Sequence, residues 1–174
     1  MEQKQISFLI DTNSFITPYQ LYYPFDLAPN FWRCMEEEIL NGNIVILDKV
    51  YDELIKGDDE LSAWVSSIEG LELAKHKDAK IIGKYSEVLA HVQSSGFYTP
   101  KALAEWSDAR VADPWLIACA SVFNYKIVTF EGLNKNLNKA SPSSHPKIPD
   151  VCREFGVECK NLMDMMRDLS ISLK

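Results

Sequence analysis

Short apolar runs alternate with stretches of helical spacing along this chain. Runs typical of strands buried on both faces lie at Phe8–Ile10, Ile44–Leu47 and 126–130, and an edge strand is expected to begin at Val157. Strands that alternate with helices favour a parallel sheet covered on both faces. The pattern therefore predicts an α/β fold with a mainly parallel central sheet.

The connections carry the helical pattern. Phe31, Met35 and Ile39 recur every four residues and predict a helix over 31–41, capped by Asn30 and ended by Gly42. Further helices are expected at 50–56, 59–69, 78–94, 100–106, 149–155 and 162–169. The aromatic stretch 19–30 is expected to be irregular, and the polar stretch 134–149 to form a surface loop.

Length and composition are those of one globular domain over residues 1–174. The 174 residues are 47% hydrophobic and 25% charged. Residues 1–5 are too short and polar for a signal peptide, and no run approaches the roughly 20 apolar residues of a membrane helix. We therefore expect a cytoplasmic protein with no membrane partner.

The net charge of −7 argues against binding of nucleic acid by a broadly basic surface. It does not exclude a nuclease, because bound divalent cations reverse the local sign. The four cysteines form no CxxC pair, so we expect no zinc site. Cys34 and Cys119 fall in helical patterns and are expected to be core thiols, while His76, His91 and His145 are scattered and expected to be solvated or structural.

Acidic residues stand at comparable places in four segments. Asp11 directly follows the first strand, and Glu53 lies one turn into the helix after the second. Asp113, followed by Pro114, is expected to cap the helix that leads into the third clear strand, and Glu131 follows that strand. Right-handed crossovers would bring these positions to one edge of the sheet.

Carboxylates gathered in this way repel one another unless cations are bound. Mg²⁺ and Mn²⁺ prefer such oxygen ligands, and they suit phosphodiester hydrolysis by activating water and steadying the leaving oxygen. Each acid also has a plainer interpretation, as a turn residue, surface charge, helix cap or loop acid. Asp52 is a rival to Glu53, and Asp108 and Asp150 are weaker candidates.

In these acidic segments the sequence resembles the PIN-domain nucleases. The matching segments are 8–13, 50–54, 113–118 and 127–131, in the order and spacing of that family's four acidic motifs. The aromatic stretch, Asp113-Pro114-Trp115 and residues 147–152 look more like an uncharacterised PIN-like subfamily than like the best-studied toxins. The resemblance implies a three-layer α/β/α sandwich and a metal-dependent endoribonuclease, often the toxin of a toxin–antitoxin pair.

The resemblance also implies roles for particular residues. It carries Asp11, Glu53 and Asp113 over as metal ligands for Mg²⁺ or Mn²⁺, with Asn13 and Thr129 supporting them. The family usually has Asp where this chain has Glu131, so Glu131 is expected to reach a second metal through water. RNA as substrate, a homodimer and a small antitoxin partner are further implications.

Two alternatives to a nuclease stay open. A PIN-like fold retained as a catalytically weak RNA-binding or protein-interaction module would need no metal. A phosphatase of the haloacid-dehalogenase type also places an Asp after its first strand, but it needs an acid two residues later, where this chain has Asn13. Basic residues that could guide phosphates in a nuclease are Lys49, Arg110, Lys135 and Lys139.

Overall fold

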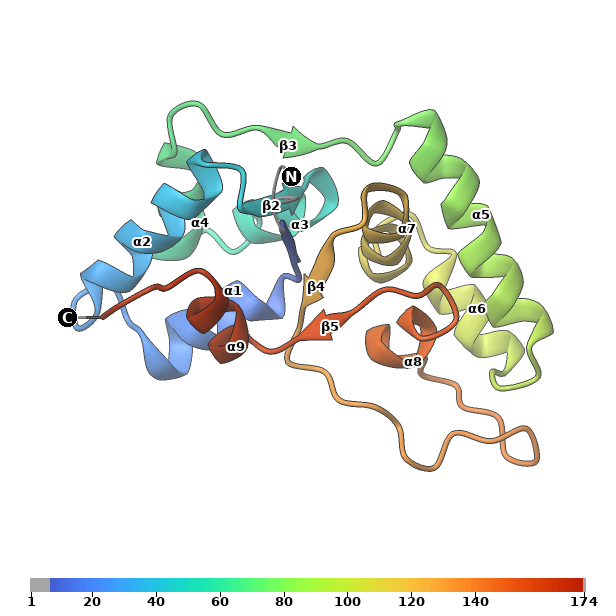
Figure 1. Ribbon diagram of the computed structural model, residues 1–174. Helices are drawn as coiled ribbons and strands as arrows, with labels where there is room; N and C mark the ends of the chain where they lie inside the picture. Colours follow the sequence, from blue (N-terminus) through green and yellow to red (C-terminus); the bar gives the residue numbers. More distant parts are fainter. Residues whose placement is uncertain (1–6, 174) are drawn as a thin grey trace, which may run out of the picture.

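A five-stranded parallel sheet forms the centre of the protein (Figure 1). The computed structural model describes residues 7–173, so the stretch 1–5, where we expect no signal peptide, lies outside the described residues. The strands are β1 Phe8–Ile10, β2 Ile44–Leu47, β3 Leu73–Ala74, β4 Lys126–Val128 and β5 Cys159–Lys160. Every neighbouring pair is parallel, in the order β3-β2-β1-β4-β5, which confirms the predicted α/β fold.

Strand β1 lies at the middle of the sheet and is fully buried. Phe8 is in register with Ile44 of β2 on one side and with Lys126 of β4 on the other. The chain adds β2 and β3 on the first side, then crosses back to add β4 and β5. In such sheets the point where the order reverses opens a crevice at the carboxyl ends of the strands, here those of β1 and β4.

Helices cover both faces and complete the three-layer α/β/α sandwich. Figure 1 shows α5, α6, α7 and α8 on one side of the sheet and α1, α2, α4 and α9 on the other. The helices are α1 Asn13–Thr17, the π-helix η1 Pro18–Tyr22, α2 Pro29–Leu40, α3 Asp48–Ile55, α4 Glu60–Ser67, α5 Ala79–Ser94, α6 Pro100–Trp106, α7 Asp113–Phe123, α8 Ile148–Cys152 and α9 Leu162–Asp168. None in the described part of the chain is long and apolar enough to cross a membrane.

The aromatic stretch is more regular than predicted. It continues α1 through η1, and α2 then starts at Pro29, so Asn30 lies inside the helix and is not its cap. Pro29 takes the first position because its fixed φ suits a helix start. Two contacts explain the regular structure of this stretch. Phe25 stacks on Trp32 with ring centroids 4.4 Å apart, and the Trp32 Nε1–H group donates to the carbonyl oxygen of Tyr23 at 2.7 Å.

Strand boundaries also differ from the predictions. β4 ends at Val128 rather than at 130, and the edge strand starts at Cys159 rather than at Val157. β3 was not predicted, because its two residues carry no periodicity. Cys119 is buried as expected, but Cys34 is only half-buried and so is not a core thiol.

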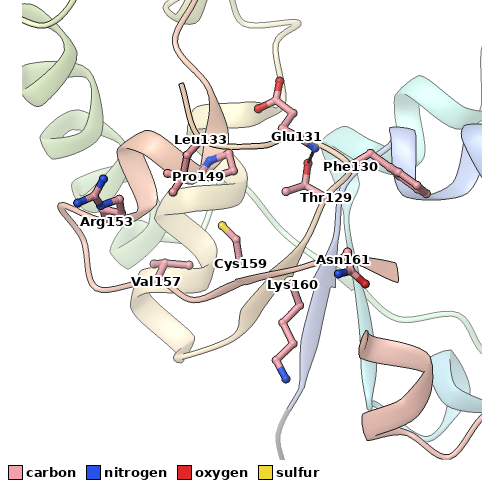
Figure 2. A pocket seen from close by; sticks show the side chains of 10 residues that line it. All are labelled: Thr129, Phe130, Glu131, Leu133, Pro149, Arg153, Val157, Cys159, Lys160 and Asn161. Carbon is pink, nitrogen blue, oxygen red and sulfur yellow. Dashed lines mark hydrogen bonds between the residues drawn. The ribbon is translucent and has the colours of Figure 1, made fainter. Parts of the chain in front are cut away.

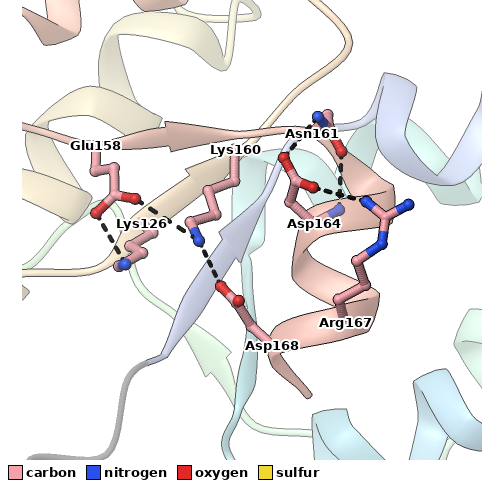
Figure 3. A network of polar contacts seen from close by, with 7 residues as sticks. All are labelled: Lys126, Glu158, Lys160, Asn161, Asp164, Arg167 and Asp168. Carbon is pink, nitrogen blue, oxygen red and sulfur yellow. Dashed lines mark hydrogen bonds and ion pairs between the residues drawn. The ribbon is translucent and has the colours of Figure 1, made fainter. Parts of the chain in front are cut away.

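Ion pairs fix the short edge strand β5 (Figure 3). Lys126 of β4 pairs with Glu158 at 2.8 Å, and Lys160 pairs with Asp168 of α9 at 2.6 Å. Asn161 caps α9 by accepting from the backbone N–H of Asp164 at 2.8 Å. These contacts hold both ends of a two-residue strand between β4 and α9.

Candidate active site

Asp11 is the carboxylate closest to the centre of the sheet. Its backbone N–H donates to the carbonyl oxygen of Val128 at 3.0 Å, so it stands where β1 and β4 end together. The side chain belongs to a residue only 4% exposed, and its Oδ2 accepts from the Thr129 hydroxyl at 3.1 Å. The pKa of Asp11 is raised to about 6, mainly by burial; the Thr129 hydrogen bond opposes this rise, and the charges of Glu131 and Glu53 add to it.

Asp113 reaches the same edge from α7. That helix ends just before β4 begins, so its first residue lies at the carboxyl ends of the strands. The residue before it, Ala112, is the N-cap, and Asp113 is inside the first turn, so the predicted cap role for Asp113 is wrong. Burial, then the charge of Asp11, then those of Glu131 and Glu53 raise the pKa of Asp113 to about 7. These effects outweigh the helix N-terminus, which favours a negative charge.

Glu53 lies in α3, directly after β2, and is half-buried. Its Oε2 accepts a short hydrogen bond from the hydroxyl of Thr12. This contact ties the second turn of α3 to the residue that follows Asp11. The predicted position of Glu53, at the margin of the buried face, is thereby confirmed.

Glu131 is half-buried beyond the end of β4. Its Oε2 accepts from the backbone N–H of Ile148, the first residue of α8, at 2.7 Å. Its own backbone N–H donates to the Thr129 hydroxyl at 3.1 Å. Thr129 therefore links Asp11 to Glu131 through one hydroxyl oxygen.

The two supporting residues differ in their surroundings. Thr129 is 3% exposed and bonded to Asp11 as described, whereas Asn13 is exposed, and its side chain makes no hydrogen bond to residues 7–173. Sequence reasoning missed Thr12 and Ser14, whose hydroxyls bond Glu53 and the carbonyl oxygen of Val128. Their place in the turn after β1, beside Asp11, was the available signal.

The rival acids have other partners or face solvent. Asp108 pairs with Arg110 at 2.6 Å, and Asp150 accepts from the backbone N–H of Asn134 at 3.0 Å. Asp52 is exposed on α3. Asp108 and Asp150 are thus engaged in contacts away from the four predicted acids.

The basic candidates are partly engaged as well. The Lys49 ammonium donates to the carbonyl oxygen of Ala109 at 2.8 Å, and that of Lys139 lies 5.3 Å from the ring centre of Phe97. His76 is structural, since its Nδ1 lies 2.9 Å from a carboxylate oxygen of Asp48.

The carboxylate oxygens of the four acids are the ligands that a hard cation prefers, but the acids are not positioned to coordinate one ion together. Each of the four predicted acids acts on the pKa of Asp113 or is Asp113 itself, so they share one electrostatic environment. Within residues 7–173, however, no three His, Cys, Asp or Glu side chains are close enough to share one metal ion. Glu53 and Glu131 are held by Thr12 and Ile148 instead.

A cavity of about 430 Å³ opens beside this edge (Figure 2). Residues of the segment after β4, including Thr129 and Glu131, form one wall, and residues in and beside α8 and β5 form the rest. Because Thr129 also bonds Asp11, the cavity lies next to the acidic edge.

Fold and site together define an α/β protein with clustered carboxylates at the reversal point of a parallel sheet. The family model described as a domain of unknown function, DUF4411, matches residues 8–173, and the chain belongs to this family. No curated protein matches the sequence.

Proposed function

We propose that this protein is a divalent-metal-dependent ribonuclease that hydrolyses RNA phosphodiester bonds. The observation that carries the proposal is that buried Asp11 and half-buried Asp113 lie at one edge of the sheet, where burial first and then the charges of Glu131 and Glu53 raise the pKa of both. Perturbed groups in a crevice of this kind are typical of functional sites. A divalent cation would offset their repulsion and return them to the charged form.

Asp11, Asp113 and Glu53 are the residues that would hold Mg²⁺ or Mn²⁺, with Glu131 acting through water. Bound there, the cation would supply an activated water and charge stabilisation for a leaving oxygen. Thr129 orients the Asp11 carboxylate, and Thr12 orients that of Glu53. Glu131 keeps its bond to Ile148, which agrees with an indirect role.

RNA as the substrate rests on the PIN-like order of the four acidic segments. The same resemblance supports a cytoplasmic toxin with an antitoxin partner and a homodimeric state, all of which belong to this proposal. A non-catalytic RNA-binding or protein-interaction module is the second candidate. The observation in its favour is that Glu53 and Glu131 accept hydrogen bonds from Thr12 and Ile148, which occupy oxygens that a metal would need.

Calorimetric titration with Mn²⁺, followed by incubation with a pool of structured RNAs, tests the proposal. We expect the native protein to bind Mn²⁺ and cleave RNA, and Asp11→Asn and Asp113→Asn to lose at least about 100-fold of the cleavage rate, as expected when a charge-stabilising group is removed. Asp52→Asn is the matched control, because Asp52 is an exposed acid on the same helix as Glu53.

The results separate the two candidates. Cleavage that persists in both Asn variants would refute the assignment of the site. Absence of Mn²⁺ binding by the native protein, with RNA binding retained, would favour the non-catalytic module.

A further inference from the structure

We propose that the cavity beside Glu131 is a subsite for one unpaired nucleobase of the RNA substrate. This inference rests on the proposed function for its substrate. It adds that the RNA must be single-stranded at this position and that the protein contacts a base there. The residues that carry it are Phe130, Tyr22, Cys159 and Arg153.

The cavity is placed to receive a nucleotide next to the acids. Its wall residue Thr129 donates to Asp11 at 3.1 Å, so one hydrogen bond separates the cavity from the candidate catalytic carboxylates. Its volume of about 430 Å³ lies in the range of cavities that hold small organic ligands. A nucleotide whose phosphate met Asp11 would have its base within reach of this space.

An exposed aromatic pair borders the cavity. Phe130 lines it and is 41% exposed, and its ring stacks on that of Tyr22, itself 54% exposed, with centroids 6.4 Å apart and planes at 21°. Apolar rings exposed to water are unfavourable, and covering them lowers the free energy. Stacking on a nucleobase would cover them, and it requires a base that is not paired in a duplex.

The lining of the cavity is mainly apolar, although Glu131 and Arg153 also belong to it. Leu133, Pro149 and Val157 line it, and the Cys159 thiol points inward between α8 and β5 (Figure 2). Lys160 also lines it, but its ammonium turns away to Asp168 and Glu158 at 2.6 and 3.8 Å (Figure 3). A flat, largely apolar base fits such a lining better than a phosphate or a carboxylate does.

Arg153, at the end of the cavity away from Thr129, could contact a phosphate of the RNA backbone (Figure 2). Arg153 is exposed, and its guanidinium has no acidic or hydrogen-bonding partner in the part of the chain that the structure describes. Arg153 and Leu133 also line a second cavity of about 630 Å³, which contains Phe97, Tyr98 and Lys135. The path from the acids therefore continues past Arg153 to aromatic side chains and Lys135, as expected for a single strand, although Asp150 and Glu154 also line this second cavity.

Fluorescence anisotropy with a labelled short single-stranded RNA tests the aromatic part. The Asp11→Asn background prevents cleavage, so the assay reports binding alone. We expect Phe130→Ala to weaken binding by about tenfold, because base–aromatic stacking contributes about 1–3 kcal/mol. Phe130→Trp should retain it. Phe123→Ala is the matched control: Phe123 is 40% exposed and stacks on Tyr125 at 5.6 Å, but it lies at the opposite edge of the sheet.

The same assay tests the cation. Arg153→Gln should weaken binding of every sequence alike and reduce the slope of log affinity against log salt by about 0.7. Arg33→Gln is the control, because Arg33 is an exposed arginine on α2 that pairs with Glu37 at 3.5 Å. An equal effect of both substitutions would mean that only general charge is involved.

Alkylation of cysteine tests occupancy of the cavity directly. Cys159 and Cys34 are both half-buried, whereas Cys119 and Cys152 are buried. Bound single-stranded RNA should slow alkylation of Cys159 several-fold and leave Cys34 unchanged. An RNA with abasic sites should bind more weakly than the intact strand and should protect Cys159 less.

The outcomes distinguish the two proposals. If RNA binds in a base-dependent way and protects Cys159, but no divalent metal supports cleavage, the ribonuclease proposal is refuted and the subsite proposal is retained. Equal binding of intact and abasic RNA, equal affinity for a duplex, or no RNA binding would overturn the subsite, even if the protein cleaves RNA.

Discussion

A single hydroxyl tunes the most buried acid of the candidate site. Thr129 donates to Asp11, and this hydrogen bond limits the rise that burial causes in the pKa of Asp11, which stands at about 6. The same oxygen accepts from the backbone N–H of Glu131. Thr129 therefore sets how readily Asp11 loses its proton, which metal binding requires.

Thr129→Val should move the pH dependence of Mn²⁺ binding to higher pH. Without the hydrogen bond the pKa of Asp11 rises, so Mn²⁺ affinity should fall several-fold near pH 6 and change little at pH 8.5, where Asp11 is ionised in both forms. Calorimetric titration across this range measures the shift.

Thr129→Ser is the control, because it keeps the hydroxyl. It should reproduce the native pH profile. A uniform loss of affinity at all pH values in Thr129→Val would instead indicate a change of structure at the end of β4.

At the scale of elements, two carboxylates fasten the long loop between β4 and α8. Glu131 reaches forward to the backbone N–H of Ile148, and Asp150 of α8 reaches back to that of Asn134, at 2.7 and 3.0 Å. These two hydrogen bonds close the loop at both ends. The acid that the sequence suggests as a distant metal ligand thus also has a structural role.

Glu131→Ala should loosen this loop, whereas Glu131→Gln should not. The amide oxygen of Gln can still accept from Ile148, but Ala leaves that N–H without its partner, at a cost of about 1–3 kcal/mol. We expect faster tryptic cleavage after Lys135 and Lys139 in the Ala variant, followed by mass spectrometry. Equal cleavage rates in the two variants would show that the loop is held by other contacts.

The sequence was most informative where a pattern spans several residues. The apolar runs of β1, β2 and β4 and the periodicity of α5 and α6 are long enough to identify each element. The helix starts at Pro29 and Asp113 were each displaced by a residue or two, because proline fits either side of the predicted boundary. β3 carries no local pattern and forms because β2 offers it an edge.

At the scale of the whole molecule, the sheet order explains why the four acids could be foreseen as a group. Parallel strands put every strand end on one edge, so residues up to 120 positions apart in sequence arrive together. Thr12 holds Glu53, and the backbone N–H of Ile148 holds Glu131. These hydrogen bonds depend on how α3 and α8 pack, so the spacing of residues in the sequence could not predict them. The cavity around Cys159 likewise arises from packing between distant segments.

The grouped acids should also make the metal-free protein less stable as the pH rises. The pKa values of Asp11 and Asp113 are about 6 and 7 in the folded protein, against 3.8 without the fold. Between these values the folded state holds protons that the unfolded state has lost, so the free energy of unfolding falls as the pH rises from about 4 to 7 and then levels off. For Asp11 alone the change over the whole interval between its two pKa values is about 3 kcal/mol.

Thermal unfolding in the presence of a chelator, recorded from pH 4 to 8, measures this slope. We expect the melting temperature to fall across the range, and Asp11→Asn together with Asp113→Asn to flatten the decline. Asp168 is not expected to contribute, because Lys160 lowers its pKa and it titrates below this window. Added Mn²⁺ should raise the melting temperature most at pH 8, since ionised carboxylates bind it best and ligand binding to the folded state stabilises that state. A slope that is unchanged in the double variant would show that these acids do not share the buried, mutually repelling environment on which the proposed metal site depends.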